Sequence, residues 1–237
     1  MKLPTLVFLH GAGTGAWIWD CVLDRLPAPC ASLDLPSRTP GATPETCADR
    51  LVETLEKQEV SQRLVFVLHS LAGVLAAPLA VRLGKRMHGC IYVGAVVPRA
   101  GQSFAQTLGF PARVVLPLLF RMHPDGLRPS AAMIRKELCG ELTDADAERV
   151  VDSYQPEFPG LYLTPVSAPP AVPSVYIKLT RDASVPPKLQ NKIISRLPNP
   201  DVCELSTGHL PMLSAPDDLA SILDPSQKRL SFLTPSP

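Results

Sequence analysis

Short apolar runs alternate along this chain with segments in which apolar residues recur every three or four positions. The first apolar run, Thr5 to His10, ends at Gly11, and apolar side chains then return at helical intervals from Gly15 to Leu26. A compact apolar run is typical of a strand, whereas the second pattern is typical of an amphipathic helix. The chain therefore begins with a strand, a loop and a helix.

The same alternation continues to residue 223 and predicts the fold class. Strands that alternate with helices form a parallel sheet with helices on both faces, so we expect an α/β fold with a doubly wound, mostly parallel sheet of about six strands. Thr43 is expected to cap a helix that has Pro44 in its first turn. The other predicted strands are Cys30–Asp34, Arg63–Leu68, Gly89–Ala95, Ser174–Leu179 and Val202–Leu205, and the other predicted helices are Leu71–Leu83, Pro187–Arg196 and Pro216–Leu223.

The segment between the fourth and fifth predicted strands is too long for an ordinary connection. It has no strand pattern, and it includes the charged helical stretch Thr143–Tyr154. We interpret residues 98–170 as a helical lid inserted into an α/β core of residues 1–97 and 171–224. Residues 225–237 contain three prolines and little periodicity, so we expect a loosely held C-terminal tail.

Composition excludes several classes of partner. The 237 residues are 46% hydrophobic and 19% charged, which is enough apolar surface for one core. Lys and Arg number 23 against 22 Asp and Glu, so the net charge of +1 creates no field that would attract nucleic acid or an anionic membrane. We expect no nucleic-acid or membrane partner, and a homodimer stays open.

The cysteines and the N-terminus point to a cytoplasmic protein. Six cysteines are scattered without a CxxC motif or a Cys/His pair at metal-binding spacing, so we expect reduced thiols and no metal site. The apolar run Leu6–Leu9 is much shorter than the core of a signal peptide. No glycine-rich dinucleotide motif or phosphate loop is present, and we expect no cofactor.

Ser70 lies between the third predicted strand and the helix that follows it. A serine on such a tight turn presents its hydroxyl above the end of the sheet, at a helix N-terminus that favours developing negative charge. The usual pattern has glycine two residues before and two after the serine, whereas this chain has Leu68 and Ala72, with Gly73 one place late. The pattern indicates a nucleophile, and the alternative is a serine that only caps the helix.

Asp182 and His209 follow the fifth and sixth predicted strands. Taken alone, Asp182 before proline is a turn-forming residue, and His209 is a solvated loop histidine. Together with Ser70 they give the order serine, acid, histidine at three strand ends, which is the chain order of the hydrolase triad. We therefore expect Ser70, Asp182 and His209 to be the catalytic residues.

The segment from His10 to Gly13 follows the first strand and contains small residues that allow a substrate oxygen to approach the backbone closely. Tetrahedral acyl chemistry requires two hydrogen-bond donors for the oxyanion, and we assign them to the backbone N–H groups of Ala12 and Leu71. The alternative for His10-Gly11 is a plain turn at the end of a strand.

Five short segments over nearly the whole chain resemble the α/β-hydrolase superfamily. Their spacing resembles its methylesterase and hydroxynitrile lyase branch and that branch's bacterial esterase relatives, where Tyr176-Ile177-Lys178 and Gln190 also have counterparts. The chain departs from that branch at Thr14, where histidine is usual. The segments are His10-Gly11-Ala12, Gly15-Ala16-Trp17 with Trp19, His69-Ser70-Leu71, Thr180–Pro186 and Gly208–Leu213.

The resemblance implies a carboxylesterase with a Ser-Asp-His triad. The apolar residues of the predicted lid would suit a small, hydrophobic ester, although we expect most of them to pack the lid onto the sheet. Two alternatives remain: a lyase that cleaves a cyanohydrin-like C–C bond, and a non-catalytic receptor or scaffold. Lyase members of the branch have threonine and lysine where this chain has Gly11 and Leu210. We expect substrate contacts from Gly11, Trp17, Phe104, Phe120 and Leu210.

Overall fold

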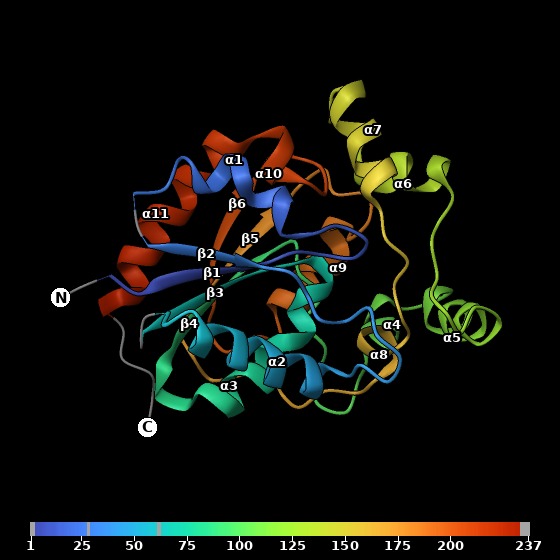
Figure 1. Cartoon of the computed structure of the whole chain (residues 1–237). Helices are drawn as coiled ribbons and strands as arrows, with labels where there is room; N and C mark the ends of the chain where they lie inside the picture. The colour runs from blue at the N-terminus through green and yellow to red at the C-terminus, as the bar shows by residue number, and fades with distance from the viewer. Residues whose placement is uncertain (1–2, 28, 61–62, 233–237) are drawn as a thin grey trace.

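The computed structural model describes residues 3–27, 29–60 and 63–232, and it contains one parallel sheet. Six strands are hydrogen-bonded in the order β2-β1-β3-β4-β5-β6, which confirms the predicted doubly wound α/β fold (Figure 1). The strands are β1 Thr5–Leu9, β2 Cys30–Leu33, β3 Leu64–His69, β4 Met87–Val93, β5 Ser174–Leu179 and β6 Asp201–Leu205.

Helices cover both faces of the sheet (Figure 1). In the orientation of Figure 1, α2 Pro44–Lys57 and α3 Ala76–Leu83 lie below the sheet. The short α1 Asp20–Leu23, α10 Pro211–Ser214 and α11 Pro216–Phe232 lie above it. The remaining elements of the core are the 3-10 helices η1 Ala16–Trp19, η2 Ser70–Leu75 and η3 Gly84–Arg86, and the helix α9 Pro187–Ile194.

The two faces of the sheet explain the unbroken apolar pattern of its central strands. In β3, Leu64, Phe66 and Leu68 pack with α2 and α3, whereas Val65 and Val67 pack in the opposite core with Trp19 and α11. Since every side chain of this strand is buried on one face or the other, no polar alternation remains in the sequence.

The strand order reverses direction between β1 and β3, so the loops that follow these two neighbouring strands leave the sheet toward opposite faces. In open parallel sheets a crevice forms at this switch point, outside the carboxyl ends of the strands. The loop from His10 to Gly13 follows β1 and Ser70 follows β3, so both border the crevice.

The segment between β4 and β5 is helical and covers the carboxyl ends of the strands at the right of Figure 1. Its helices are joined by extended stretches, and one isolated antiparallel bridge pairs Leu127 with Glu157. We call this segment the lid, as the sequence suggested. The lid helices are α4 Phe104–Leu108, α5 Ala112–Met122, α6 Ala131–Leu138, α7 Asp144–Ser153 and α8 Gly160–Leu163.

The expectation of a loosely held tail is wrong for residues 225–232, because α11 continues through Pro225 to Phe232. Leu230 is fully buried against the sheet, and the Gln227 side-chain amide donates a hydrogen bond to the carbonyl of Pro4. These contacts stabilise the helix beyond its proline, which a local pattern cannot reveal. Residues 233–237 of the predicted tail lie outside the described residues.

Two predicted helices differ in detail. The helix expected at Leu71–Leu83 begins as the 3-10 helix η2 and becomes α-helical only at Ala76, and the one expected at Gly15–Leu26 is limited to η1 and α1. Thr43 caps α2 as expected, its hydroxyl accepting from the backbone N–H of Thr46. In the described part of the chain, no helix is both long and apolar enough to cross a bilayer.

Candidate active site

Ser70 occupies a sharp turn between β3 and η2, with a backbone φ of 51°. Its carbonyl accepts a hydrogen bond of 3.0 Å from the Val96 N–H, which holds the turn against the segment after β4. A Cβ on Gly73 would lie 2.4 Å from the Val96 carbonyl oxygen, so only glycine allows this approach. Leu68 and Ala72 are fully buried in the core, and the turn persists with these side chains in the places usually held by glycine.

The structure brings together the three residues that the sequence singled out. The Ser70 Oγ lies 3.0 Å from Nε2 of His209, and Nδ1 of His209 lies 2.9 Å from Oδ2 of Asp182. All three residues are at most 5% exposed, although 139 residues separate Ser70 from His209 in the chain. Because a carboxylate only accepts, the imidazole donates from Nδ1 and leaves Nε2 to accept the serine proton. This is the arrangement of a nucleophile, a base and an orienting acid.

The Asp182 carboxylate also organises its own turn. Its Oδ1 accepts hydrogen bonds from the backbone N–H groups of Ser184 at 2.9 Å and Val185 at 2.8 Å. The turn-forming role considered from the sequence is therefore correct, and it coexists with the contact to His209. Oδ1 accepts from the backbone and Oδ2 contacts His209, so the backbone hydrogen bonds fix the direction in which Oδ2 points toward the imidazole.

His69 lies beside the same site as a buried, neutral imidazole. Its Nε2 is 2.9 Å from the carbonyl oxygen of His209, to which it donates, and the two rings have centroids 4.8 Å apart. Burial and the neighbouring His209 hold the pKa of His69 well below its usual value. The hydrogen bond from His69 supports the backbone of the loop that positions His209.

The loop after β1 has a fixed peptide orientation at Gly11. The Gly11 carbonyl accepts from His10 Nδ1 at 2.8 Å and from the Thr14 hydroxyl at 3.2 Å. His10 Nε2 accepts from the Leu35 N–H, so the ring proton is on Nδ1, and burial lowers the pKa of His10 to about 4. In a trans peptide the N–H points away from the carbonyl, so these two bonds also fix the direction of the Ala12 N–H.

The lid contacts this loop through a buried carboxylate that the sequence did not reveal. Glu157 is 2% exposed, and its Oε1 accepts from the Gly13 N–H at 2.8 Å and from the Arg38 guanidinium at 2.9 Å. Arg38 also donates to the Thr14 carbonyl, and the N–H of Gln155 donates to the Gly13 carbonyl. Burial raises the pKa of Glu157, although Arg38 opposes this effect.

A second lid carboxylate, Glu141, contacts both loops that provide the acid and the histidine. Its Oε2 accepts from the backbone N–H of Gly208 at 2.8 Å, and its Oε1 pairs with Arg181 at 2.8 Å. Gly208 precedes His209, and Arg181 precedes Asp182. The lid is therefore hydrogen-bonded to the loops on both sides of Ser70.

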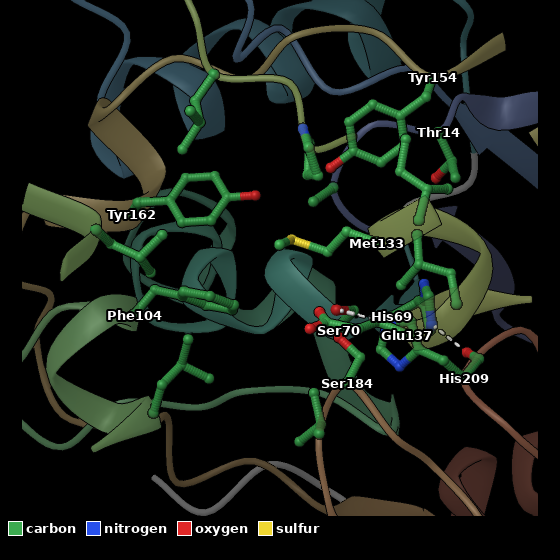
Figure 2. Close-up of a pocket in the computed structure, with 18 of the residues that line it drawn as sticks. Thr14, His69, Ser70, Phe104, Met133, Glu137, Tyr154, Tyr162, Ser184 and His209 are labelled. Atoms are coloured by element: carbon green, nitrogen blue, oxygen red, sulfur yellow. Dashed lines mark hydrogen bonds between the residues drawn. The ribbon is translucent and has the colours of Figure 1, made fainter. Parts of the chain in front are cut away.

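A cavity of about 320 Å³ opens above Ser70 and His209, between the lid and the sheet (Figure 2). We call it the lid cavity. Four residues for which the sequence predicted substrate contacts or oxyanion binding are among its lining residues: Ala12, Phe104, Phe120 and Leu210. Its other lining residues are mostly apolar and come chiefly from the lid: Thr14, His69, Leu108, Leu116, Leu119, Leu127, Pro129, Met133, Ile134, Glu137, Leu138, Tyr154, Tyr162, Ser184 and Val185.

Two predicted substrate contacts differ from expectation. Trp17 does not line the lid cavity: it borders a separate hollow with Asp34 and Arg38, and the Arg149 guanidinium lies 4.3 Å from its ring centroid. The 3-10 helix η1 turns this side chain away from Ser70. Gly11 lies behind the cavity wall, where a Cβ would be 2.9 Å from the Ser70 Cβ, so its role is to leave space.

Within the described residues, no cluster of three or more His, Cys, Asp or Glu side chains could hold a metal ion. The three buried cysteines, Cys47, Cys90 and Cys139, belong to the two hydrophobic cores and do not line the lid cavity.

Known proteins share this architecture. The sequence model of the alpha/beta hydrolase family matches residues 6–222. Methylesterase 17 of Arabidopsis thaliana is 24% identical over 251 residues, which cover 94% of this chain and 91% of that protein. An extracellular alpha/beta-hydrolase from a Paenibacillus species superposes with a TM-score of 0.85 at 16% identity, over 94% and 98% of the two chains. The methylesterase MES16 from Arabidopsis superposes with a TM-score of 0.75 at 21% identity, over 98% of this chain and 100% of that chain.

Proposed function

Since this chain belongs to the alpha/beta hydrolase family, we propose that it is a serine carboxylesterase that hydrolyses a small, hydrophobic ester through an acyl-enzyme intermediate. The observation on which this rests is the continuous contact from Ser70 Oγ through the His209 imidazole to the Asp182 carboxylate, at 3.0 and 2.9 Å. This contact borders an apolar cavity that is lined chiefly by the lid.

In the first half-reaction His209 removes the proton from Ser70, whose oxygen attacks the ester carbonyl. Asp182 holds the imidazole in the tautomer that accepts at Nε2, and it stabilises the imidazolium that forms. The backbone N–H groups of Ala12 and Leu71 bind the oxyanion of the tetrahedral intermediate. As this intermediate collapses, His209 gives its proton to the leaving alcohol, and the acyl group remains on Ser70.

In the second half-reaction water takes the place of the alcohol. His209 removes a proton from the water as it attacks the acyl-enzyme, and the same two N–H groups bind the second oxyanion. Collapse returns the proton to Ser70 Oγ and releases the carboxylic acid. No cofactor takes part in either half-reaction.

The lining of the lid cavity supports an apolar ester as substrate. Phe104, Phe120 and Leu210 offer hydrocarbon surface next to Ser70, and an apolar group that leaves water for such a surface gains about 25 cal/mol per Å². Two of the relatives are methylesterases by name, so methyl esters of hydrophobic acids are the first substrates to assay.

A fluorophosphonate probe tests the proposal, because it reacts only with an activated serine. We expect covalent labelling of the peptide that contains Ser70, detected by mass spectrometry, and no labelling of Ser70→Ala with the fold intact by circular dichroism. The Ser70→Ala variant should also lose hydrolysis of p-nitrophenyl acetate, with kcat reduced by up to about 10⁶-fold as in other serine enzymes. An unlabelled wild-type protein, or a Ser70→Ala variant that keeps a tenth of the rate, would contradict the proposal and favour a non-catalytic scaffold.

A further inference from the structure

Two tyrosine hydroxyls point into the lid cavity without a partner. Tyr154 and Tyr162 both line the cavity and are only 8% and 9% exposed. Figure 2 shows their hydroxyl oxygens directed toward the open space above Ser70. Neither oxygen has a hydrogen-bond partner among the described residues, although buried tyrosine hydroxyls usually find one.

The two tyrosines outside the cavity behave differently. The Tyr176 hydroxyl donates to the Ala95 carbonyl at 2.8 Å, and Tyr92 interacts with Cys90 inside the core. The chain contains four tyrosines, so the two whose hydroxyls face the cavity are the two that the protein itself does not satisfy. A ligand that fills this mostly apolar cavity and displaces water from the two hydroxyls loses free energy, unless it provides the missing hydrogen bonds itself.

Both rings are held firmly. The Tyr162 ring packs between Phe104 and Phe120, with ring centroids 5.1 and 5.0 Å away. The Tyr154 ring lies against Gly13, where a Cβ would be only 2.0 Å from its Cε2 atom, so glycine is needed for this contact. Because their rings cannot swing away, the two hydroxyls are preorganised for one position in the cavity.

The charge around the hydroxyls restricts the group that they can bind. Among the described residues, Glu137 is the only carboxylate that lines the lid cavity, and no lysine or arginine lines it. Burial raises the pKa of Tyr154 and of Tyr162, so both stay protonated and can donate as well as accept. A substrate anion here would meet a carboxylate and no cation, and the cavity therefore favours an uncharged oxygen.

We infer that Tyr154 and Tyr162 form a subsite for an uncharged oxygen group, a hydroxyl, ether or carbonyl, on the otherwise apolar part of the ester. The inference rests on the proposed esterase function, because it concerns an ester bound at Ser70. It narrows the substrate class from any hydrophobic ester to one that has a second oxygen function away from the reacting carbonyl.

The test compares esters that differ in one group. Three pairs vary the position of a hydroxyl group, which a methyl group replaces in the second ester of each pair. Two pairs compare methyl 3- and 4-hydroxyphenylacetate with methyl 3- and 4-methylphenylacetate, and the third compares methyl 6-hydroxyhexanoate with methyl heptanoate. We expect at least one hydroxy ester to exceed its isostere in kcat/KM by about tenfold, the effect of a hydrogen bond to an otherwise unpaired buried group. Equal rates within all three pairs would overturn the inference.

Variants assign the preference to the two hydroxyls. Tyr154→Phe and Tyr162→Phe should each lower kcat/KM for the preferred hydroxy ester by about fivefold or more, and change the isostere less than about twofold. Tyr92→Phe is the matched control, since Tyr92 is buried away from the cavity, and it should leave the preference unchanged. If the phenylalanine variants lower both esters of a pair equally, the rings serve only packing and the inference is wrong.

A binding measurement separates this inference from the esterase proposal. Calorimetric titration of the same pairs into Ser70→Ala does not depend on turnover. The preferred hydroxy ester should bind this variant about tenfold more tightly than its isostere, and the difference should disappear when Tyr162→Phe is added. Selective binding without hydrolysis by the wild type would contradict the esterase proposal and support the subsite. Hydrolysis without selective binding would support the esterase and overturn the subsite.

Discussion

The carboxylate of Glu157 in the lid accepts a hydrogen bond of 2.8 Å from the backbone N–H of Gly13, in the loop after β1. The same oxygen is paired with Arg38, which also donates to the Thr14 carbonyl. Gln155 completes the contact by donating to the Gly13 carbonyl at 2.9 Å. The loop that contains the Ala12 N–H is thus hydrogen-bonded to the lid through both its Gly13 N–H and its Gly13 carbonyl.

Replacement of this carboxylate should therefore impair catalysis from a distance. Glu157→Gln keeps the shape but leaves Arg38 without its counter-charge, and the loop loses its fixed position. We expect kcat for ester hydrolysis to fall about 10- to 100-fold, in the range found for outer-shell partners, with a much smaller change in KM. Steady-state kinetics well below the melting temperature measure this effect. Glu148→Gln, at an exposed site in α7, is the control and should match wild type.

Asp182 offers the sharpest test of the contact to His209. Asp182→Asn keeps an oxygen for the Ser184 and Val185 N–H groups, so the turn should survive while the imidazole loses the partner that fixes its tautomer. We expect kcat to fall by about 10⁴-fold, as for the same change in a serine protease, with little change in melting temperature.

Asp34 is the alternative acid, since it follows β2. In the structure its Oδ1 accepts from the Ala16 N–H at 2.8 Å, and its side chain is 75% exposed. Asp34→Asn should therefore stay close to wild type in the same assay. An active Asp182→Asn together with an inactive Asp34→Asn would reverse the assignment.

Buried histidine makes stability depend on pH in a definite direction. Burial lowers the pKa of His10 from 6.5 to about 4, so between these values the unfolded chain binds a proton that the folded chain does not. The free energy of unfolding must then fall as the pH decreases through this window, and His10 stops contributing to the slope below about pH 4. At 1.36 kcal/mol per pKa unit, His10 lowers the free energy of unfolding by about 3 kcal/mol across this window. The pKa of His69 is also lowered, so His69 likewise reduces stability as the pH decreases.

Urea unfolding measured from pH 7.5 to 4 tests this expectation. His10→Gln should lower stability at neutral pH and flatten the pH dependence, because the group that titrates only in the unfolded chain is gone. His123→Gln, at an exposed site in the lid, should leave the curve unchanged. If His10→Gln keeps the full wild-type slope, the buried neutral state of His10 is wrong.

The sequence predicted the parts of the site that follow strands, and it missed the parts that depend on the lid. Ser70, Asp182 and His209 each follow the end of a strand by at most four residues, and parallel strands bring their carboxyl ends to one edge, so their proximity follows from the order of the elements. No such rule predicts the position of Glu157, because its partner Gly13 is 144 residues away in the sequence and no strand pairing places the lid relative to the sheet. Only its three-dimensional contacts distinguish it from other acids of the lid.

Local geometry explains two further differences. The sequence placed Trp17 among the substrate contacts, but this residue lies on the 3-10 helix η1 and borders another hollow, and residue spacing does not distinguish a 3-10 turn from an α-helical turn. Pro225 suggested an end to α11, whereas the burial of Leu230 and the Gln227 hydrogen bond outweigh the lost backbone bond. In the first case the sequence pattern does not resolve the local geometry, and in the second a tertiary contact overrides the local signal.

Cyanohydrin cleavage is the remaining chemical alternative, and two positions beside the triad argue against it. The lyases that this chain resembles have a threonine after the first histidine and a lysine after the catalytic one. In this chain a Cβ at Gly11 would already lie 2.8 Å from His69 Nδ1, so a threonine side chain has no room there. The position of the lysine is held by Leu210, which lines the cavity and has no charge. Departing cyanide would be an unpaired anion in an apolar cavity, which costs several kcal/mol.

Each 1.36 kcal/mol lowers a rate about tenfold, so we expect benzaldehyde release from mandelonitrile to be less than about 1% of the fastest ester rate. Mandelonitrile and a panel of methyl and aryl esters are assayed with one preparation at mildly acidic and neutral pH. Ser70→Ala provides the background, because mandelonitrile also decomposes without an enzyme. Release of benzaldehyde that depends on Ser70 and exceeds every ester rate would mean that Ser70 and His209 serve a lyase, and the esterase proposal would then be wrong.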